Sequence, residues 1–140
     1  MEKEIPDFYP MPMFVKLEVA DLARATAWYE EALGFRSVYA MEGMAHVRGA
    51  RYQDLMLLAG GAPDGPRGRG MTINFAAEPE ALDALARRAS LAGEDVEGPI
   101  LRPWNARELV VRDLDGYVLT FSAPVDTNRS FDDVMKDVQA

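Results

Sequence analysis

The segment VADLARATAWYEEALGF, residues 19–35, decides the fold because it joins the end of a strand to a helix and its stop signal. Asp21 is a good helix N-cap, since its carboxylate can accept hydrogen bonds from the first turn of backbone N–H groups. Apolar residues then recur at helical spacing and form one stripe: Leu22, Ala25, Tyr29, Ala32 and Leu33. Gly34 suits the left-handed residue that ends a helix. The segment predicts a helix that runs to about Leu33.

Short strands surround this helix in the sequence. Residues 13–19 alternate in polarity, with one face formed by Val15, Leu17 and Val19 and the other by Phe14, Lys16 and Glu18. Three more strands are predicted after the helix, at residues 35–42, 45–49 and 55–59. Phe35 and Tyr39 alternate on the first of these strands and are expected to share a face. The first half therefore has the order β-α-β-β-β.

The second half of the chain repeats this order. Residues 71–76 predict a strand, and Pro79 fits the first turn of a helix that ends before Gly93. The apolar stripe of this helix consists of Leu82, Leu85, Ala86 and Ala89. Further strands are expected at residues 95–101, 108–112 and 117–122. Duplication of one supersecondary unit predicts two similar modules.

The remaining segments are predicted to lie outside the modules. Three prolines in residues 1–12 indicate an extended arm, and Ser130 can cap a last short helix in the tail. The apolar face of that helix is expected to dock on the body or on a partner subunit: Phe131, Val134, Met135 and Val138. The predicted organisation is an arm (1–12), one domain (13–124) made of modules 13–59 and 70–124 with a Gly/Pro linker (60–69), and a tail (125–140).

Composition limits the classes of function. The chain has 140 residues, of which 49% are hydrophobic and 27% charged, as expected for one globular domain. It has no cysteine, which excludes disulfides and thiolate sites, and no apolar run approaches the ~20 residues of a membrane span. A net charge of −8 disfavours nucleic acid and anionic membranes as partners. The polar N-terminus predicts a cytoplasmic protein.

The order of the motifs over residues 13–124 resembles the vicinal oxygen chelate superfamily. The motifs are a strand with Val-Ala-Asp, a helix with Trp-Tyr-x₃-Leu-Gly-Phe, then strand, helix and glycine, and finally Arg112-Asp113-Leu114-Asp115-Gly116-Tyr117. That superfamily includes glyoxalase I, extradiol dioxygenases, fosfomycin-resistance enzymes and bleomycin-resistance proteins. The resemblance implies an α+β fold in which two βαβββ modules form curved mixed sheets around a cavity, usually as a homodimer. Asp113 and Asp115 look like a carboxylate pair, but their Asp-Gly context favours a hairpin turn.

Superfamily enzymes bind a divalent metal with His and Glu side chains from four strands. The matching positions in this chain are Phe14, one residue of 55–58, one of 70–72, and Thr120. None of these offers the imidazole or carboxylate that such a cation requires. The sequence therefore predicts neither a metal nor another cofactor. His46 lies outside these positions and is interpreted as a pocket or surface histidine.

The segment Arg102-Pro103-Trp104-Asn105-Ala106-Arg107-Glu108-Leu109 is most similar to the bleomycin-resistance branch. Members of that branch are metal-free dimers that sequester the drug in a crevice, where the tryptophan of this segment stacks on its flat part. The resemblance implies that Trp104 is a stacking platform, with Tyr39 as a second aromatic and Met44 as a lining residue. Asn105 replaces a glycine, and an aromatic expected near Asn74 is missing, so the pocket need not accept bleomycin itself.

Two hypotheses of function follow. The first is a metal-free, dimeric protein without catalytic residues that confers resistance by sequestering an aromatic antibiotic, such as a bleomycin-like, enediyne or other antitumour drug. Its expected ligand contacts are Trp104, Tyr39, Phe14, Met44, Asn74, Glu18, Thr120 and Asn105. The alternative is a metal-independent enzyme that acts on a small organic substrate with a desolvated carboxylate base, such as Glu18 or Glu108.

Overall fold

The computed structural model describes residues 9–61, 65, 67–93 and 95–140. The chain divides into two compact units, Met1–Pro63 and Asp64–Ala140. Each unit carries one four-stranded sheet. The expectations for residues 1–8 of the arm and for residues 62–64 and 66 of the linker lie outside the described residues.

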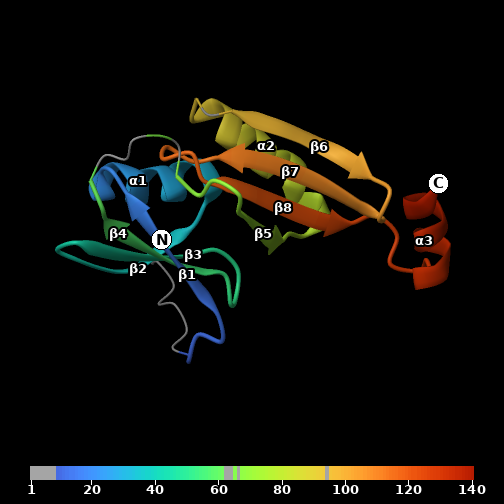
Figure 1. Ribbon diagram of the computed structural model, residues 1–140, viewed down its shortest axis with the longest axis horizontal. Coiled ribbons are helices and arrows are strands. Elements are labelled where there is room, and N and C mark those ends of the chain that lie inside the picture. The colour runs from blue at the N-terminus through green and yellow to red at the C-terminus, as the bar shows by residue number, and fades with distance from the viewer. Residues whose placement is uncertain (1–8, 62–64, 66, 94) are drawn as a thin grey trace. The chain divides into compact units, whose positions relative to one another are not determined.

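The first unit has the predicted β-α-β-β-β order (Figure 1). Its elements are β1 (Phe14–Val19), α1 (Leu22–Leu33), β2 (Arg36–Met41), β3 (Met44–Arg48) and β4 (Asp54–Ala59). The strand order is β1-β4-β3-β2, in which β1 and β4 are parallel and the other pairs antiparallel. A parallel pair needs a crossover connection, and α1 provides part of it.

Both ends of α1 follow from the signals in its sequence. The side chain of Asp21 accepts a hydrogen bond from the backbone N–H of Arg24 at 3.0 Å. Gly34 is left-handed, with φ 71°, and donates to the carbonyl of Glu30 at 3.1 Å. The helix buries Ala25, Trp28, Tyr29, Ala32 and Leu33. The core on the same side of the sheet includes Leu17, Val19, Val47, Leu55 and Leu57, so the helix covers one face and leaves the other uncovered by it.

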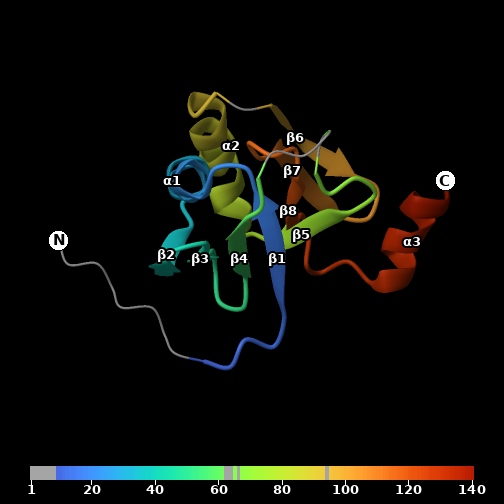
Figure 2. The same cartoon turned by 60° about the vertical axis from the view of Figure 1, so that its left-hand side comes forward.

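The second unit repeats the first (Figure 2). Its elements are β5 (Thr72–Ala76), the short 3₁₀ turn η1 (Pro79–Ala81), α2 (Leu82–Leu91), β6 (Val96–Arg102), β7 (Ala106–Arg112), β8 (Val118–Pro124) and α3 (Phe131–Gln139). The strand order, β5-β8-β7-β6, is that of the first sheet. The predicted α+β fold of two βαβββ modules is therefore confirmed.

One predicted feature of β2 is wrong. Phe35 and Tyr39 do not share a face, because the register of β2 against β3 shifts between Ser37 and Tyr39. Phe35 is buried and its ring centroid lies 5.7 Å from that of Tyr29, whereas Tyr39 is 56% exposed. A β-bulge inserts one residue and so reverses the inward and outward alternation. A similar shift separates Glu97 from Ile100 in the second sheet, so the irregularity is part of the repeat.

The last helix, α3, forms as predicted, but it does not dock on the body. The side chain of Ser130 accepts a hydrogen bond from the backbone N–H of Asp133 at 3.1 Å. The helix buries no residue, and Phe131 is 76% exposed. The alternative, docking on a partner subunit, stays a prediction. None of the helices in the described part of the chain has the length and apolarity needed to cross a bilayer.

Candidate functional site

The face of the first sheet that α1 leaves uncovered is here called free face 1. The pairing of the strands places its side chains in three rows across the sheet. The first row is Arg36, Arg48, Asp54 and Phe14, and the second row is Tyr39, His46, Met56 and Lys16. The third row is Met41, Met44, Leu58 and Glu18. Four of the predicted ligand contacts, Phe14, Tyr39, Met44 and Glu18, therefore belong to one surface. Tyr39 and Phe14 are 56% and 39% exposed, so both rings are accessible to a ligand.

A buried polar cluster occupies the first two rows of free face 1. Asp54 accepts from the hydroxyl of Tyr9 at 2.7 Å and from Nε of Arg48 at 2.6 Å. Nε2 of His46 lies 2.8 Å from the same carboxylate. Burial alone would raise the pKa of Asp54, but the hydrogen bonds from these three side chains outweigh it and hold that pKa below its ordinary value. The carboxylate is therefore charged and committed to internal donors.

Tyr9 fixes the described end of the arm to the first sheet. Its hydroxyl accepts from the backbone N–H of Tyr52 at 3.0 Å, and the guanidinium of Arg48 lies 4.1 Å from the centroid of its ring. Burial and the hydrogen bond to Asp54 raise the pKa of the Tyr9 hydroxyl above its ordinary value. The sequence patterns considered above did not predict this cluster. The available signal was the two-residue spacing of His46 and Arg48 just before Asp54, which opens the next strand.

The corresponding uncovered face of the second sheet is here called free face 2. It carries the predicted contacts Asn74 and Thr120, which are paired neighbours on β5 and β8. Thr120 is 7% exposed, and the amide of Asn74 donates to the hydroxyl of Thr72 at 3.3 Å. The structure thus brings Asn74 and Thr120 together, as it does the four contacts of free face 1.

Trp104 lies in the turn between β6 and β7, where Glu108 anchors it. The indole Nε1–H donates to one carboxylate oxygen of Glu108 at 3.0 Å, and Nε of Arg102 donates to the other at 3.1 Å. The guanidinium of Arg102 lies 5.8 Å from the centroid of the indole ring. The residue is nevertheless 48% exposed. Trp104 is therefore an oriented aromatic surface with area left for a ligand.

Asn105 has a structural role beside this platform. It is left-handed, with φ 65°, a conformation that asparagine tolerates better than most residues, so it can replace glycine. Its side chain donates to the carbonyl of Asp126 at 2.6 Å and accepts from the backbone N–H of Asp126 at 3.1 Å. A cavity of about 570 Å³ adjoins this turn and is lined by Arg102 and Asn105 together with Arg129 and Asp137 from the tail.

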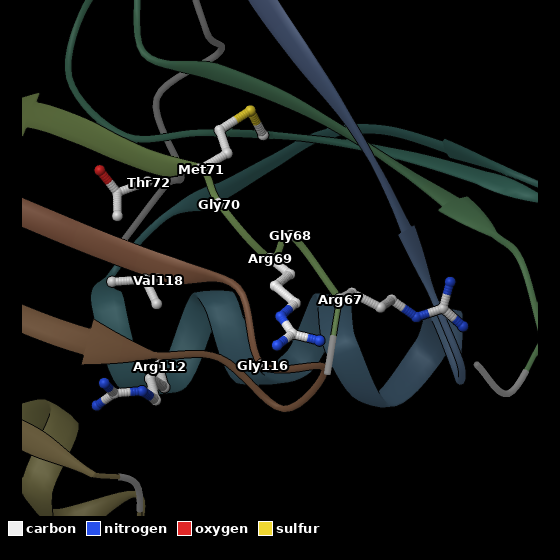
Figure 3. Close-up of a pocket in the computed structure, with 9 residues that line it drawn as sticks. All are labelled: Arg67, Gly68, Arg69, Gly70, Met71, Thr72, Arg112, Gly116 and Val118. Carbon is white, nitrogen blue, oxygen red and sulfur yellow. The ribbon is translucent and has the colours of Figure 1, made fainter. Parts of the chain in front are cut away.

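A second cavity, of about 400 Å³, lies between residues 67–72 and the β7–β8 hairpin (Figure 3). Arg69 and Arg112 line it, and the guanidinium of Arg69 reaches toward Gly116 in Figure 3. Two backbone N–H groups of the hairpin, those of Asp115 and Tyr117, donate to Oδ1 of Asp113 at 3.0 and 2.9 Å. Asp115 forms an ion pair with Arg67 at 3.4 Å. The two aspartates therefore support the turn, as their sequence context predicted.

The residues at the positions matched to superfamily metal ligands do not fit a divalent cation. Phe14 opens β1 and pairs with Asp54, and Thr120 lies on β8 beside Asn74. The candidates at residues 55–58 are Leu and Met, and those at residues 70–72 are Gly70, Met71 and Thr72. None of the side chains at these matched positions offers an imidazole or a carboxylate, and the described residues contain no group of three His, Cys, Asp or Glu side chains suited to a metal.

Several solved structures share this fold. FosX from Mesorhizobium loti, a fosfomycin resistance protein, is 21% identical, with a TM-score of 0.65 and coverage of 79% of this chain and 89% of its own. FosX from Listeria monocytogenes in complex with Mn(II) and sulfate is 16% identical, with a TM-score of 0.68 and coverage of 90% and 95%. TioX from Micromonospora sp. ML1 is 26% identical, with a TM-score of 0.59 and coverage of 80% and 97%.

No curated protein matches the sequence. A family model does, over residues 13–121, which span both modules from β1 into β8. The match covers most of the chain and agrees with the repeated architecture. The chain belongs to the Glyoxalase/Bleomycin resistance protein/Dioxygenase superfamily.

Proposed function

We propose that the protein binds and sequesters a flat, partly aromatic antibiotic without a metal, and so confers resistance to it. The observation that carries this proposal is Trp104, an indole that is 48% exposed although its N–H is fixed by Glu108. An exposed but oriented aromatic ring loses little conformational entropy when a planar ligand stacks on it. The superfamily includes proteins that give resistance to antibiotics, in agreement with this role.

The proposal assigns the remaining ligand contacts by chemistry. On free face 1, Tyr39 and Phe14 offer accessible rings, and Met44 can repack around an irregular ligand. The polar contacts that fix orientation are Glu18 on free face 1 and Asn74 and Thr120 on free face 2. Asn105 supports the Trp104 turn. The proposal includes a homodimer in the cytoplasm.

The test of this proposal uses the two tryptophans as separate reporters. Trp28→Phe leaves Trp104 as the single tryptophan, and Trp104→Phe leaves the 6% exposed Trp28 as the internal control. Titration with bleomycin, an enediyne chromophore and an anthracycline should change the fluorescence of the first variant but not that of the second. Trp104→Ala should weaken binding about tenfold, because aromatic stacking adds roughly 0.5–1.5 kcal/mol to the burial of area. Unchanged fluorescence with every compound would contradict sequestration.

A metal-independent enzyme is the second candidate, and one observation favours it. His46 and Asp54 are 2.8 Å apart on free face 1, an arrangement that can move a proton. An enzyme would release its ligand chemically changed, whereas a sequestering protein would release it intact. Mass spectrometry of the compound recovered from the complex separates the two.

A further inference from the structure

We infer that His46 is a further ligand-contacting residue of free face 1, and that it receives the proton of an acidic hydroxyl, a phenol or an enol, on a planar aromatic ligand. This inference rests on the proposed function and adds to it the chemical class of the ligand. It also gives a role to a histidine that lies outside the positions matched to metal ligands.

The two ring nitrogens of His46 have different surroundings. Nε2 lies 2.8 Å from Oδ1 of Asp54, whose carboxylate is charged, so Nε2 carries the proton and donates it to this bond. Nδ1 has no hydrogen-bond partner among the described residues. It is also not completely enclosed by the protein. With Nε2 protonated, neutral imidazole leaves Nδ1 as an acceptor. His46 is 7% exposed and therefore offers one oriented acceptor with a narrow opening to solvent.

The neighbours of His46 suit an aromatic ligand. In its row across the sheet, His46 lies between Tyr39, which is 56% exposed, and the half-buried Met56. Met44 lies two residues away on the same strand and face, and Lys16 ends the row. A ring and two thioethers around a nitrogen acceptor form a surface that is apolar except for one hydrogen-bonding point. A planar ligand with a hydroxyl at its edge matches that pattern.

The charges around His46 accommodate the transferred proton. The O–H bond of the ligand breaks, an N–H bond forms at Nδ1, and the electron pair stays on the ligand oxygen as phenolate or enolate. Asp54 stabilises the resulting imidazolium through its bond to Nε2. The charge of Arg48 is already balanced by Asp54 at 2.6 Å, so the new imidazolium pairs with the new phenolate. Lys16, in the row of His46, and Arg36, in the first row, favour the anionic ligand. Glu18, the acidic residue of free face 1 that Arg48 does not pair with, lies in the third row.

The experiment uses the dihydroxyanthraquinone dye alizarin, whose visible absorption shifts to the red when a hydroxyl ionises. Its dimethyl ether has the same ring system without an acidic proton and serves as the control ligand. Both are titrated in the presence of EDTA, at a pH where free alizarin is mostly un-ionised. Wild-type protein should bind both compounds and should shift the absorption of alizarin to that of the ionised form.

His46→Gln is the matched variant, because the glutamine amide can still donate to Asp54 from the place of Nε2 but has no counterpart of Nδ1. It should lose the spectral shift and bind alizarin about tenfold more weakly, with its affinity for the dimethyl ether unchanged. Retention of the shift in His46→Gln, or an equal loss of affinity for both compounds, would overturn the inference. Binding of the ether with no shift of alizarin in the wild type would also overturn it, while leaving sequestration standing. If neither dye binds, the assigned ligand class is wrong, and the antibiotic titration decides sequestration separately.

Discussion

At the scale of single residues, Asp54 determines the character of free face 1. A carboxylate at the start of an apolar strand would be costly to bury alone, yet its side chain is fully enclosed. Tyr9, His46 and Arg48 supply the donors that offset this cost. The same bonds occupy its oxygens, so the residue supports its neighbours and is not available to a metal ion.

Removal of the Arg48 charge should destabilise the first unit. In Arg48→Met the buried carboxylate of Asp54 keeps its charge without its cationic partner, and the free energy of unfolding should fall by about 3 kcal/mol. The double variant Arg48→Met/Asp54→Asn should lose less, because no charge is then left buried. Urea denaturation measures both. A single variant within about 0.5 kcal/mol of the wild type would contradict the role of this pair.

The lowered pKa of Asp54 predicts a specific loss of stability in acid. Because the folded state holds the pKa below the ordinary value of 3.8, the stabilisation is present above that pH and is lost as pH falls through the folded pKa. Asp54→Asn should therefore show a flatter decline of unfolding free energy below about pH 4 than the wild type. Asp83→Asn, at a surface ion pair with Arg107, is the control and should keep the wild-type slope. Equal slopes for Asp54→Asn and the wild type would refute the assignment.

Glu108 should control the mobility of Trp104. In the Trp28→Phe background, Glu108→Ala removes the acceptor of the indole N–H and should increase quenching of Trp104 fluorescence by acrylamide. Glu108→Gln keeps an amide oxygen that can accept the hydrogen bond of the indole. Its quenching should therefore be closer to that of the Trp28→Phe parent. Quenching that is the same in all three proteins would show that Glu108 does not hold the ring.

At the scale of elements, the two modules repeat the same topology with different local support. The N-cap of α1 is the side chain of Asp21, whereas the N-cap position of η1, Glu78, makes no side-chain hydrogen bond. The η1 turn also begins with Pro79, whose missing backbone N–H would have no partner at the first helical position. The same position in the repeat is thus stabilised by different means.

This difference gives a matched pair of variants. Asp21→Ala should lower the free energy of unfolding by about 1 kcal/mol, the usual contribution of an N-cap carboxylate. Glu78→Ala, at the corresponding place in the second module, should change it by less than about 0.5 kcal/mol. Thermal or urea unfolding of the two variants is the measurement. Equal losses at both sites would mean that the cap of α1 is not formed.

Local signals predicted most of the elements, and the errors come from long-range effects. Helix caps, helix-ending glycines and the alternation of apolar and polar residues are signals that span only a few residues. They predicted the ends of α1, α3 and the strands to within about two residues. The face of Tyr39 depended on a bulge in β2, which a strict two-residue period cannot show. The role of Asp54 depended on Tyr9, 45 positions earlier, and on partners from a neighbouring strand. No local pattern carries that information.

At the scale of the whole molecule, the tail adds little to the stability of the chain. The α3 helix buries no residue, and its ion pairs link Arg129 to Asp133 and Asp137 at 2.8 and 2.9 Å on the exposed surface. Ion pairs of this kind contribute little to folding. The apolar side of α3, with Phe131 at 76% exposure, is surface that the isolated chain does not cover.

Deletion of residues 130–140 should therefore leave the free energy of unfolding within about 0.5 kcal/mol of the full chain at low protein concentration. The residues that connect the tail to the Trp104 turn, up to Asp126, remain in this variant. Urea denaturation at several protein concentrations checks the result. A large loss that grows with concentration would instead show that α3 contributes to an assembly of subunits.

Asn105 is bonded to Asp126 through both ends of its amide, and its carbonyl accepts from the backbone N–H of Val125 at 3.0 Å. These three bonds tie the root of the tail to the residue that follows Trp104. A displacement of residues 125 and 126 would therefore act first on Asn105, the residue next to Trp104. The start of the tail and the turn that carries the exposed indole thus share one set of hydrogen bonds, so a change in the first would be felt by the second.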